Sequence, residues 1–187
     1  NIKYQGLQVS NCFRSSDVMF MQDEKVFSGI EGQRNEMAKV LMELVRVSAV
    51  APENGGEGEL KKAEKLRQIL EAVSFDKIER FDAEDKRVPS KRRPNMIAYC
   101  YGQNEDEKLW VITHLDVVPP GEESLWTVTN PFEPVIKEGR IYGRGSEDNG
   151  QSMVASVFAI KTLKSLGIKP KRTVALAFVA DEEQGSK

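Results

Sequence analysis

One histidine and several carboxylates stand where two apolar segments of the chain end. His114, the only histidine, directly follows the apolar run LWVIT at 109–113, and Asp116 lies two residues further on. An acidic triplet at 181–183 follows a second apolar run, VALAFVA at 174–180. In open α/β sheets, ligands bind outside the carboxyl ends of the strands. We therefore expect the histidine and the acidic triplet to meet at one edge of a sheet.

A further acid, Asp148, lies in the loop GRGSEDNG, before a predicted helix whose dipole favours negative charge. One imidazole with several carboxylates is the ligand set of a catalytic divalent-metal site, zinc first, with cobalt or manganese as alternatives. Asp116 lies on the same side of an extended backbone as His114, and a ligating histidine usually donates its second N–H to such a group. Glu182 and Glu183 can divide two roles, one binding metal and the other accepting a proton from a metal-bound water.

Each of these features also has a structural interpretation. Taken singly, His114 with Asp116 predicts a hydrogen-bonded structural histidine, Asp148 predicts a helix-start residue, and the triplet at 181–183 predicts a solvated strand exit. The convergence of all three at one predicted sheet edge favours a metal site. The chain lacks the GxxxxGK[ST] and GxGxxG phosphate motifs and the GxSxG nucleophile elbow.

The elements that would position these groups follow from the apolar pattern. The two apolar runs are continuous rather than alternating, which predicts strands covered on both faces in a mostly parallel sheet flanked by helices, an α/β fold. A hairpin is predicted to turn at Glu138-Gly139. The remaining predictions are helices over 29–50, 60–73 and 151–166, a loop over 51–59, and strands over 77–81 and 95–101.

Composition narrows the class of protein. The 187 residues are 40% hydrophobic and 30% charged, with a net charge of -2, which argues against a general nucleic-acid binder. No apolar run approaches the ~20 residues that span a bilayer, and no signal-peptide pattern opens the chain. Cys12 and Cys100 form no CxxC pair, so we expect a reducing, cytoplasmic setting, without membrane or nucleic-acid partners.

Four motifs, in this order and spacing, resemble the M20 metallopeptidases. They are THLDVVPPG at 113–121, Trp126 with PFEP at 131–134, GRIYGRGSEDNG at 139–150, and DEEQGS at 181–186. The family includes acetylornithine deacetylase, succinyl-diaminopimelate desuccinylase, aminoacylase-1 and carboxypeptidase G2. The chain departs from the family pattern in two ways: Asn149-Gly150-Gln151 stands instead of the common Lys-Gly, and the later part of the family's pattern is absent.

The resemblance implies a zinc-peptidase-like catalytic domain with a co-catalytic dizinc site. Carried over by motif, His114 would bind one metal, Asp148 would bridge both, and Glu183 would be a ligand of one. Asp116 would hold the His114 ring. Glu182 would be the general base, taking a proton from the bridging water before the hydroxide attacks an amide carbonyl.

The resemblance also implies that the catalytic domain is incomplete in this chain. Residues 28–187 would form its N-terminal part, without the lid and dimerisation domain or the C-terminal part that carry the family's remaining ligands. Residues 1–27 are treated as a leader that need not be native, and the stretch 1–18 is expected to add nothing to the fold. We expect the isolated 187-residue piece to be poorly soluble and close to inactive. For the full-length protein the resemblance implies a homodimer, whose contact would lie in the absent lid.

The predicted function is that of a metal-dependent amide hydrolase acting on an N-acyl amino acid or a short peptide. Two alternatives remain: a non-catalytic M20-like domain or inactive fragment that binds a ligand without turnover, and a module that holds a single metal through His114, Asp148 and Glu183. The sequence does not separate a deacylase from a dipeptidase.

Overall fold

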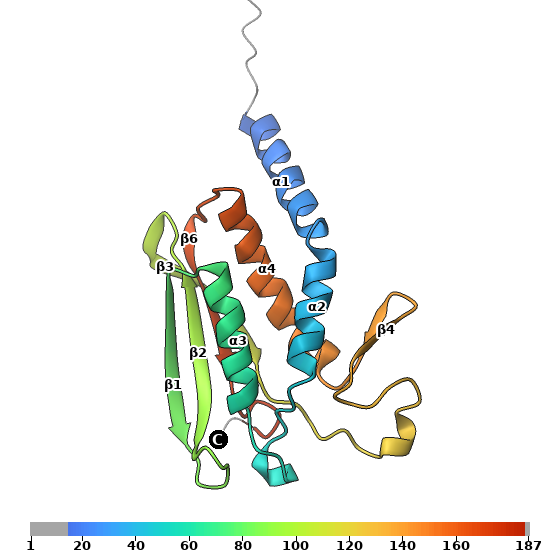
Figure 1. The fold of residues 1–187 in the computed structure, drawn as a ribbon. Coiled ribbons are helices and arrows are strands. Elements are labelled where there is room, and N and C mark those ends of the chain that lie inside the picture. The colour runs from blue at the N-terminus through green and yellow to red at the C-terminus, as the bar shows by residue number, and fades with distance from the viewer. Residues whose placement is uncertain (1–14, 186–187) are drawn as a thin grey trace, which may run out of the picture.

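The computed structural model describes residues 15–185, with side chains from residue 22 onward. Figure 1 shows a twisted sheet with helices packed on one of its faces, and a small hairpin that projects to the side. No helix within the described residues is both long and apolar enough to cross a membrane. The elements are α1 (Ser15–Glu31), α2 (Arg34–Val45), α3 (Leu60–Val73), β1 (Lys77–Glu84), β2 (Arg92–Cys100), β3 (Asn104–His114), β4 (Val135–Lys137), β5 (Arg140–Tyr142), α4 (Ser152–Ser165) and β6 (Arg172–Val179).

The main sheet has the strand order β1-β2-β6-β3 and is mixed. β3 and β6 are parallel, whereas β1–β2 and β2–β6 are antiparallel. The α/β class is confirmed. The prediction of a mostly parallel sheet is wrong for the described strands, because only one of their three pairings is parallel. A short loop at 85–91 can join only antiparallel neighbours, while the long connection through α4 allows β3 and β6 to run parallel.

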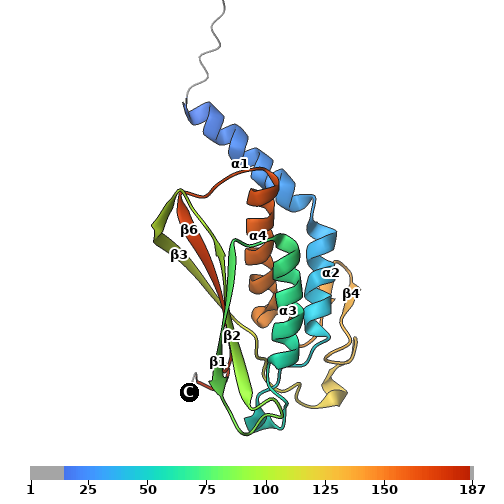
Figure 2. The same cartoon turned by 60° about the vertical axis from the view of Figure 1, so that its left-hand side comes forward.

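The two predicted central strands differ in burial. β6 is buried along almost its whole length, as its continuous apolar sequence predicts. β3 is an edge strand of the described sheet, and Leu109, Trp110 and Ile112 are 55, 47 and 68% exposed. The prediction that 109–113 is covered on both faces is therefore wrong for the described chain. In Figure 2 the helices lie along one face of the sheet and leave the other open.

The helix boundaries also differ from the predictions. The apolar repeat predicted one helix over 29–50, but α1 ends at Glu31 and α2 begins at Arg34. α1 begins at Ser15, so part of the stretch 1–18 is helical, and residues 1–14 lie outside the described chain. A Cβ on Gly29 would meet Thr162 Cγ2 of α4 at 2.9 Å, so a glycine is needed for this close approach.

α2, α3 and α4 enclose the core against the sheet (Figures 1 and 2). α3 matches its predicted bounds, and α4 ends just before Gly167, whose φ of 66° terminates the helix. The β4–β5 hairpin turns at Glu138-Gly139 as predicted, both with positive φ. Core members from the helices and sheet include Leu41, Leu44, Leu66, Leu70, Met96, Met153, Phe158, Leu176 and Phe178.

Candidate metal centre

The parallel pairing of β3 with β6 brings the histidine and the acidic triplet to one sheet edge. His114 is the last residue of β3 and pairs with Val179, the last residue of β6. Leu115 N–H continues the ladder by donating to Val179 O at 2.7 Å. The two segments therefore leave the sheet side by side, and Glu182 and Glu183 lie within 5 Å of the histidine. The expected meeting at one edge is confirmed.

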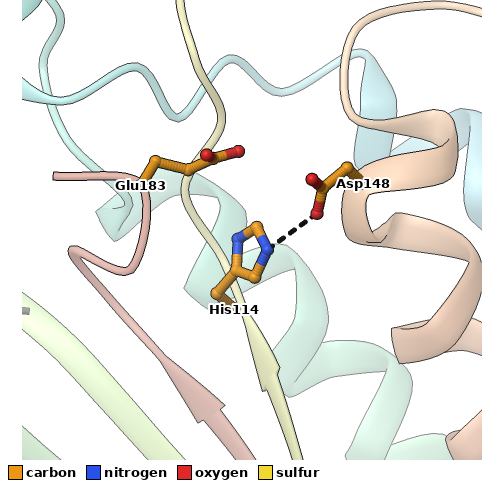
Figure 3. A group of neighbouring side chains, drawn as sticks. All are labelled: His114, Asp148 and Glu183. Atoms are coloured by element: carbon orange, nitrogen blue, oxygen red, sulfur yellow. Dashed lines mark hydrogen bonds and ion pairs between the residues drawn. The ribbon is translucent and has the colours of Figure 1, made fainter. Parts of the chain in front are cut away.

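Asp148 reaches the same place from the irregular turn Ser146–Gln151, which precedes α4. Its backbone is extended, with φ -100° and ψ 102°, and the Asp148–Asn149 peptide bond is cis. The side chain is 72% exposed and points to the imidazole, with Oδ1 3.0 Å from His114 Nε2 (Figure 3). Three separate segments thus supply one group each.

His114, Asp148 and Glu183 form a cluster that fits a metal ion. One ligand atom from each lies within 4.8 Å of the other two. Ligands held ~2 Å from one ion lie roughly 3–4 Å apart, so small side-chain movements would close this set around zinc. Figure 3 shows both carboxylates directed toward the imidazole from different elements. One nitrogen and two carboxylates are also the donor set that the sequence predicts here.

The histidine ring is oriented from its far side. The Nδ1 atom lies 3.1 Å from the backbone oxygen of Asp116, and Nδ1–H can donate to it. That tautomer leaves the Nε2 lone pair free on the side of Asp148 and Glu183. The Asp116 carboxylate lies further away, with Oδ1 3.6 Å from Nδ1. Asp116 thus contacts the ring chiefly through its backbone.

The Asp116 carboxylate instead holds the acidic segment. Its Oδ1 accepts a hydrogen bond from the Glu182 amide at 3.2 Å, and its Oδ2 accepts one from the Glu183 amide at 2.9 Å. The residue is 1% exposed. Burial alone would raise the pKa of Asp116, but the nearby His114 ring and the hydrogen bonds from these two amides lower it below its ordinary value. The carboxylate is therefore charged and fixed at neutral pH.

The electrostatics favour a cation at the cluster. The neighbouring carboxylates of Asp116 and Asp148 outweigh burial and raise the pKa of His114 to about 9. Burial, followed by the charge of Asp148, raises the pKa of Glu183. Without a cation, like charges crowd one another and a proton sits on the ring. A divalent ion would neutralise the carboxylates and take the place of that proton.

The two adjacent glutamates have different surroundings. The Glu182 side chain is 54% exposed and lies 3.9 Å from His114 Nε2, whereas Glu183 is part of the metal-sized cluster. The structure thus brings together all five predicted site residues, His114, Asp116, Asp148, Glu182 and Glu183. The roles of these residues remain predictions.

The sequence reasoning missed two polar groups beneath the site. Lys62 of α3 and Asn149 line a cavity of about 10 Å³ with His114 and Asp116. Burial lowers the pKa of Lys62 to about 8, although Asp116 and Glu59 act against this shift. The buried Oδ1 of Asn149 has no hydrogen-bond partner among the described residues. The one available signal was that Lys62 lies four residues before Leu66 on the apolar face of its helix.

The motif-bearing segment matches a known family. Residues 110–187 match the model of peptidase family M20/M25/M40. The chain is also 42% identical over 156 residues to an uncharacterized metallohydrolase of Methanocaldococcus jannaschii, covering 81% of this chain and 38% of that protein. Residues 110–187 thus carry the sequence pattern of the M20 peptidases. The resemblance stated from its motifs is confirmed.

Other M20 relatives agree in sequence and in fold. A succinyl-diaminopimelate desuccinylase of Alkalilimnicola ehrlichii is 32% identical over 150 residues, covering 80% of this chain and 36% of that protein. The M20 metallo-carboxypeptidase Sso-CP2 of Sulfolobus solfataricus superposes with a TM-score of 0.67 at 28% identity, over 81% of this chain and 32% of that chain. The dipeptidase Dug1p of Saccharomyces cerevisiae shares the fold, with a TM-score of 0.72 at 22% identity over 87% of this chain and 35% of its own. The chain thus spans between 32 and 38% of the length of these relatives.

Proposed function

We propose that this chain carries metal-ligating and proton-transfer groups of a metal-dependent hydrolase that cleaves an amide bond. The observation that carries the proposal is the cluster of His114, Asp148 and Glu183, whose ligand atoms lie within 4.8 Å of one another beside the exposed Glu182. A structural histidine would not need two partly exposed carboxylates brought to it from separate segments. The match of residues 110–187 to the M20 peptidase family supports the same chemistry.

His114, Asp148 and Glu183 would hold the metal, with Asp148 bridging when two ions are present. Asp148 is suited to bridging because its carboxylate is 72% exposed and has room on the side away from the imidazole. Bound zinc, or cobalt or manganese in its place, supplies a Lewis acid that polarises a carbonyl and acidifies water. His114 stays oriented for ligation through its Nδ1 contact with Asp116 O.

Glu182 would act as the general base. Its carboxylate lies at the rim of the cluster and reaches solvent, so it can accept a proton from the attacking water and later pass it to the leaving amine. The hydrogen bond from its amide to Asp116 Oδ1 holds its backbone while the side chain remains free. One carboxylate thereby serves both proton transfers.

The substrate class proposed is an N-acyl amino acid or a short peptide. The desuccinylase from Alkalilimnicola ehrlichii is named for removing an acyl group, and the yeast relative is described as a dipeptidase. Both reactions break a C–N amide bond, and the same three ligands and one base serve either. Assays on the full-length protein should therefore include N-succinyl and N-acetyl amino acids together with dipeptides.

The test compares Glu182→Gln with wild type in metal content and turnover. We expect Glu182→Gln to bind zinc as wild type does and to lose at least about 100-fold in kcat, because removal of a general base typically costs 10²–10⁴-fold. Glu147→Gln is the matched control, an exposed glutamate in the same segment as Asp148 that is absent from the cluster, and should keep full activity. Loss of metal in Glu182→Gln would refute the division of roles. Metal binding without turnover in wild type would support the alternative of a non-catalytic M20-like domain.

A further inference from the structure

A buried arginine outside the metal cluster contacts the segment that carries the two glutamates. The Arg93 side chain, on β2, is only 5% exposed. It forms a two-point contact with Glu59, in which Nε donates to Oε2 at 3.1 Å and Nη2 contacts Oε1. Its remaining nitrogen, Nη1, donates to Asp181 Oδ1 at 2.5 Å. Asp181 directly precedes Glu182.

The contact with Glu59 orients Arg93 so that it donates a charge-assisted hydrogen bond to Asp181. Glu59 is fully buried, so its carboxylate has to be paired, and its contact with Nε and Nη2 fixes the plane of the guanidinium. With that plane fixed, the directions of the Nη1 N–H groups are fixed as well, and one of them meets Asp181. Lysine would not reproduce this geometry, because an ammonium group lacks a planar fork that reaches two carboxylates at once.

Asp181 adopts a backbone conformation that needs support. Its φ is 66°, a value that non-glycine residues rarely adopt because the Cβ then crowds the following carbonyl oxygen. The residue is also 7% exposed, so its carboxylate is largely removed from water. The ion pair with Arg93 compensates both costs and holds the sharp turn by which the chain leaves β6.

The same segment is held at each of its residues. Ala180 N donates to Asn95 Oδ1 at 3.0 Å, Asp181 accepts from Arg93, and the amides of Glu182 and Glu183 donate to Asp116. Two of the three anchors, Arg93 and Asn95, therefore come from β2, which carries none of the cluster residues. A segment fixed at four consecutive residues has little freedom to move its backbone.

We propose that Arg93, fixed by Glu59, is a positioning residue that holds Asp181 and thereby sets where Glu182 and Glu183 stand relative to His114 and Asp148. This inference rests on the proposed function for its catalytic consequence. Arg93 would touch neither metal nor substrate. Without it, the turn at Asp181 would relax, moving the ligand Glu183 and the base Glu182 together.

The test uses Asp181→Asn in the full-length protein, with Asp85→Asn as the matched control. Asparagine tolerates positive φ and keeps the size of the side chain, so the substitution mainly removes the charge that faces Arg93. Asp85 belongs to the same ionic network, 3.9 Å from Arg93 Nη1 and paired with Arg87, but it does not precede the glutamates. Arg93→Lys is the second variant, keeping a cation beside Glu59.

Four quantities are measured: zinc affinity by competition with a chelator, kcat, KM, and amide hydrogen exchange at residues 182 and 183 in the metal-free protein. For Asp181→Asn we expect zinc affinity and kcat to fall about 10–100-fold, the range for groups that support metal ligands, with KM little changed. Exchange at 182 and 183 should become faster. Arg93→Lys should also lower zinc affinity and kcat and make exchange faster. Asp85→Asn should leave these three quantities unchanged.

The inference is overturned if Asp181→Asn affects zinc affinity, kcat and exchange no more than Asp85→Asn does. If Arg93→Lys does not fold, the two aspartate variants decide. A wild-type protein that binds no zinc and hydrolyses no amide would refute the proposed function. If exchange were still faster in Asp181→Asn than in wild type, the positioning of the segment by Arg93 would stand.

Discussion

At the scale of single residues, the cluster combines groups whose protonation depends on one another. Asp116 accepts two amide hydrogen bonds and lies beside the His114 ring, while Lys62 lines the small cavity below them. The site thus contains a buried cation of its own beneath the carboxylates. That cation is 5% exposed and is held there at a cost in hydration.

Lys62 predicts a pH dependence of stability. Its pKa is lowered from 10.5 to about 8 in the folded protein, so the unfolded chain binds more protons between these values. The free energy of unfolding therefore gains from this group as pH rises from about 8 to 10.5, and the penalty is fully present below pH 8. The shift corresponds to about 3 kcal/mol.

Lys62→Met isolates this term, because the apolar stem is retained and the ionisable group is lost. In metal-free protein, the stability advantage of Lys62→Met over wild type should shrink by about 3 kcal/mol between pH 7 and pH 10.5. Urea unfolding at a series of pH values measures the difference. A difference that does not vary with pH would contradict the lowered pKa. Lys61→Met, on the exposed side of the same helix, is the control.

At the scale of elements, the two strands that end at the site differ in what holds them. β6 is covered by helices and paired on both sides, whereas β3 is paired only with β6 among the described strands. Phe178 is fully buried in the core, and Ile112 is 68% exposed on the edge strand. Similar apolar sequences therefore contribute very differently to stability.

Truncation of these two side chains should show the difference. Phe178→Ala removes a completely buried ring and should lower the free energy of unfolding by about 3–5 kcal/mol. Ile112→Ala should lower it by less than about 1 kcal/mol, because most of the side chain is already in water. Chemical denaturation of both variants measures this. Equal losses would mean that a segment not described here, or a partner, covers β3.

At the scale of the whole molecule, metal binding joins three distant segments and should stabilise the fold. A ligand that binds only the folded state at 100 times its Kd adds about 2.7 kcal/mol. Zinc, cobalt or manganese should therefore raise Tm, and a chelator should reverse the rise. His114→Ala is expected to abolish the effect by removing the only nitrogen ligand. An equal Tm rise in His114→Ala would place the metal elsewhere.

The candidate site was predictable from the sequence because it obeys local rules. His114 and residues 181–183 follow apolar strands, and Asp148 precedes a helix, so the strand-end rule for α/β sheets was enough to bring them together. The helix at 60–73 and the hairpin at Glu138-Gly139 were equally predictable, since residue spacing and turn residues determine them locally. The break between α1 and α2 was not predicted, although Gly32 lies at it and residues 31–36 contain no apolar side chain.

What only the tertiary structure decided are the contacts between residues far apart in the chain. The pairing of β2 with β6 made the sheet mixed and brought Arg93 to Asp181, 88 positions away, and Glu59 is 34 positions from the same arginine. β3 became an edge strand for the same reason, despite a sequence that predicts burial. The sequence by itself determined which side chains can bind a metal and which element each one ends or begins, because periodicity and residue type act over a few positions. Strand order and buried ion pairs depend instead on which surfaces meet, and that is set by the packing of the whole chain.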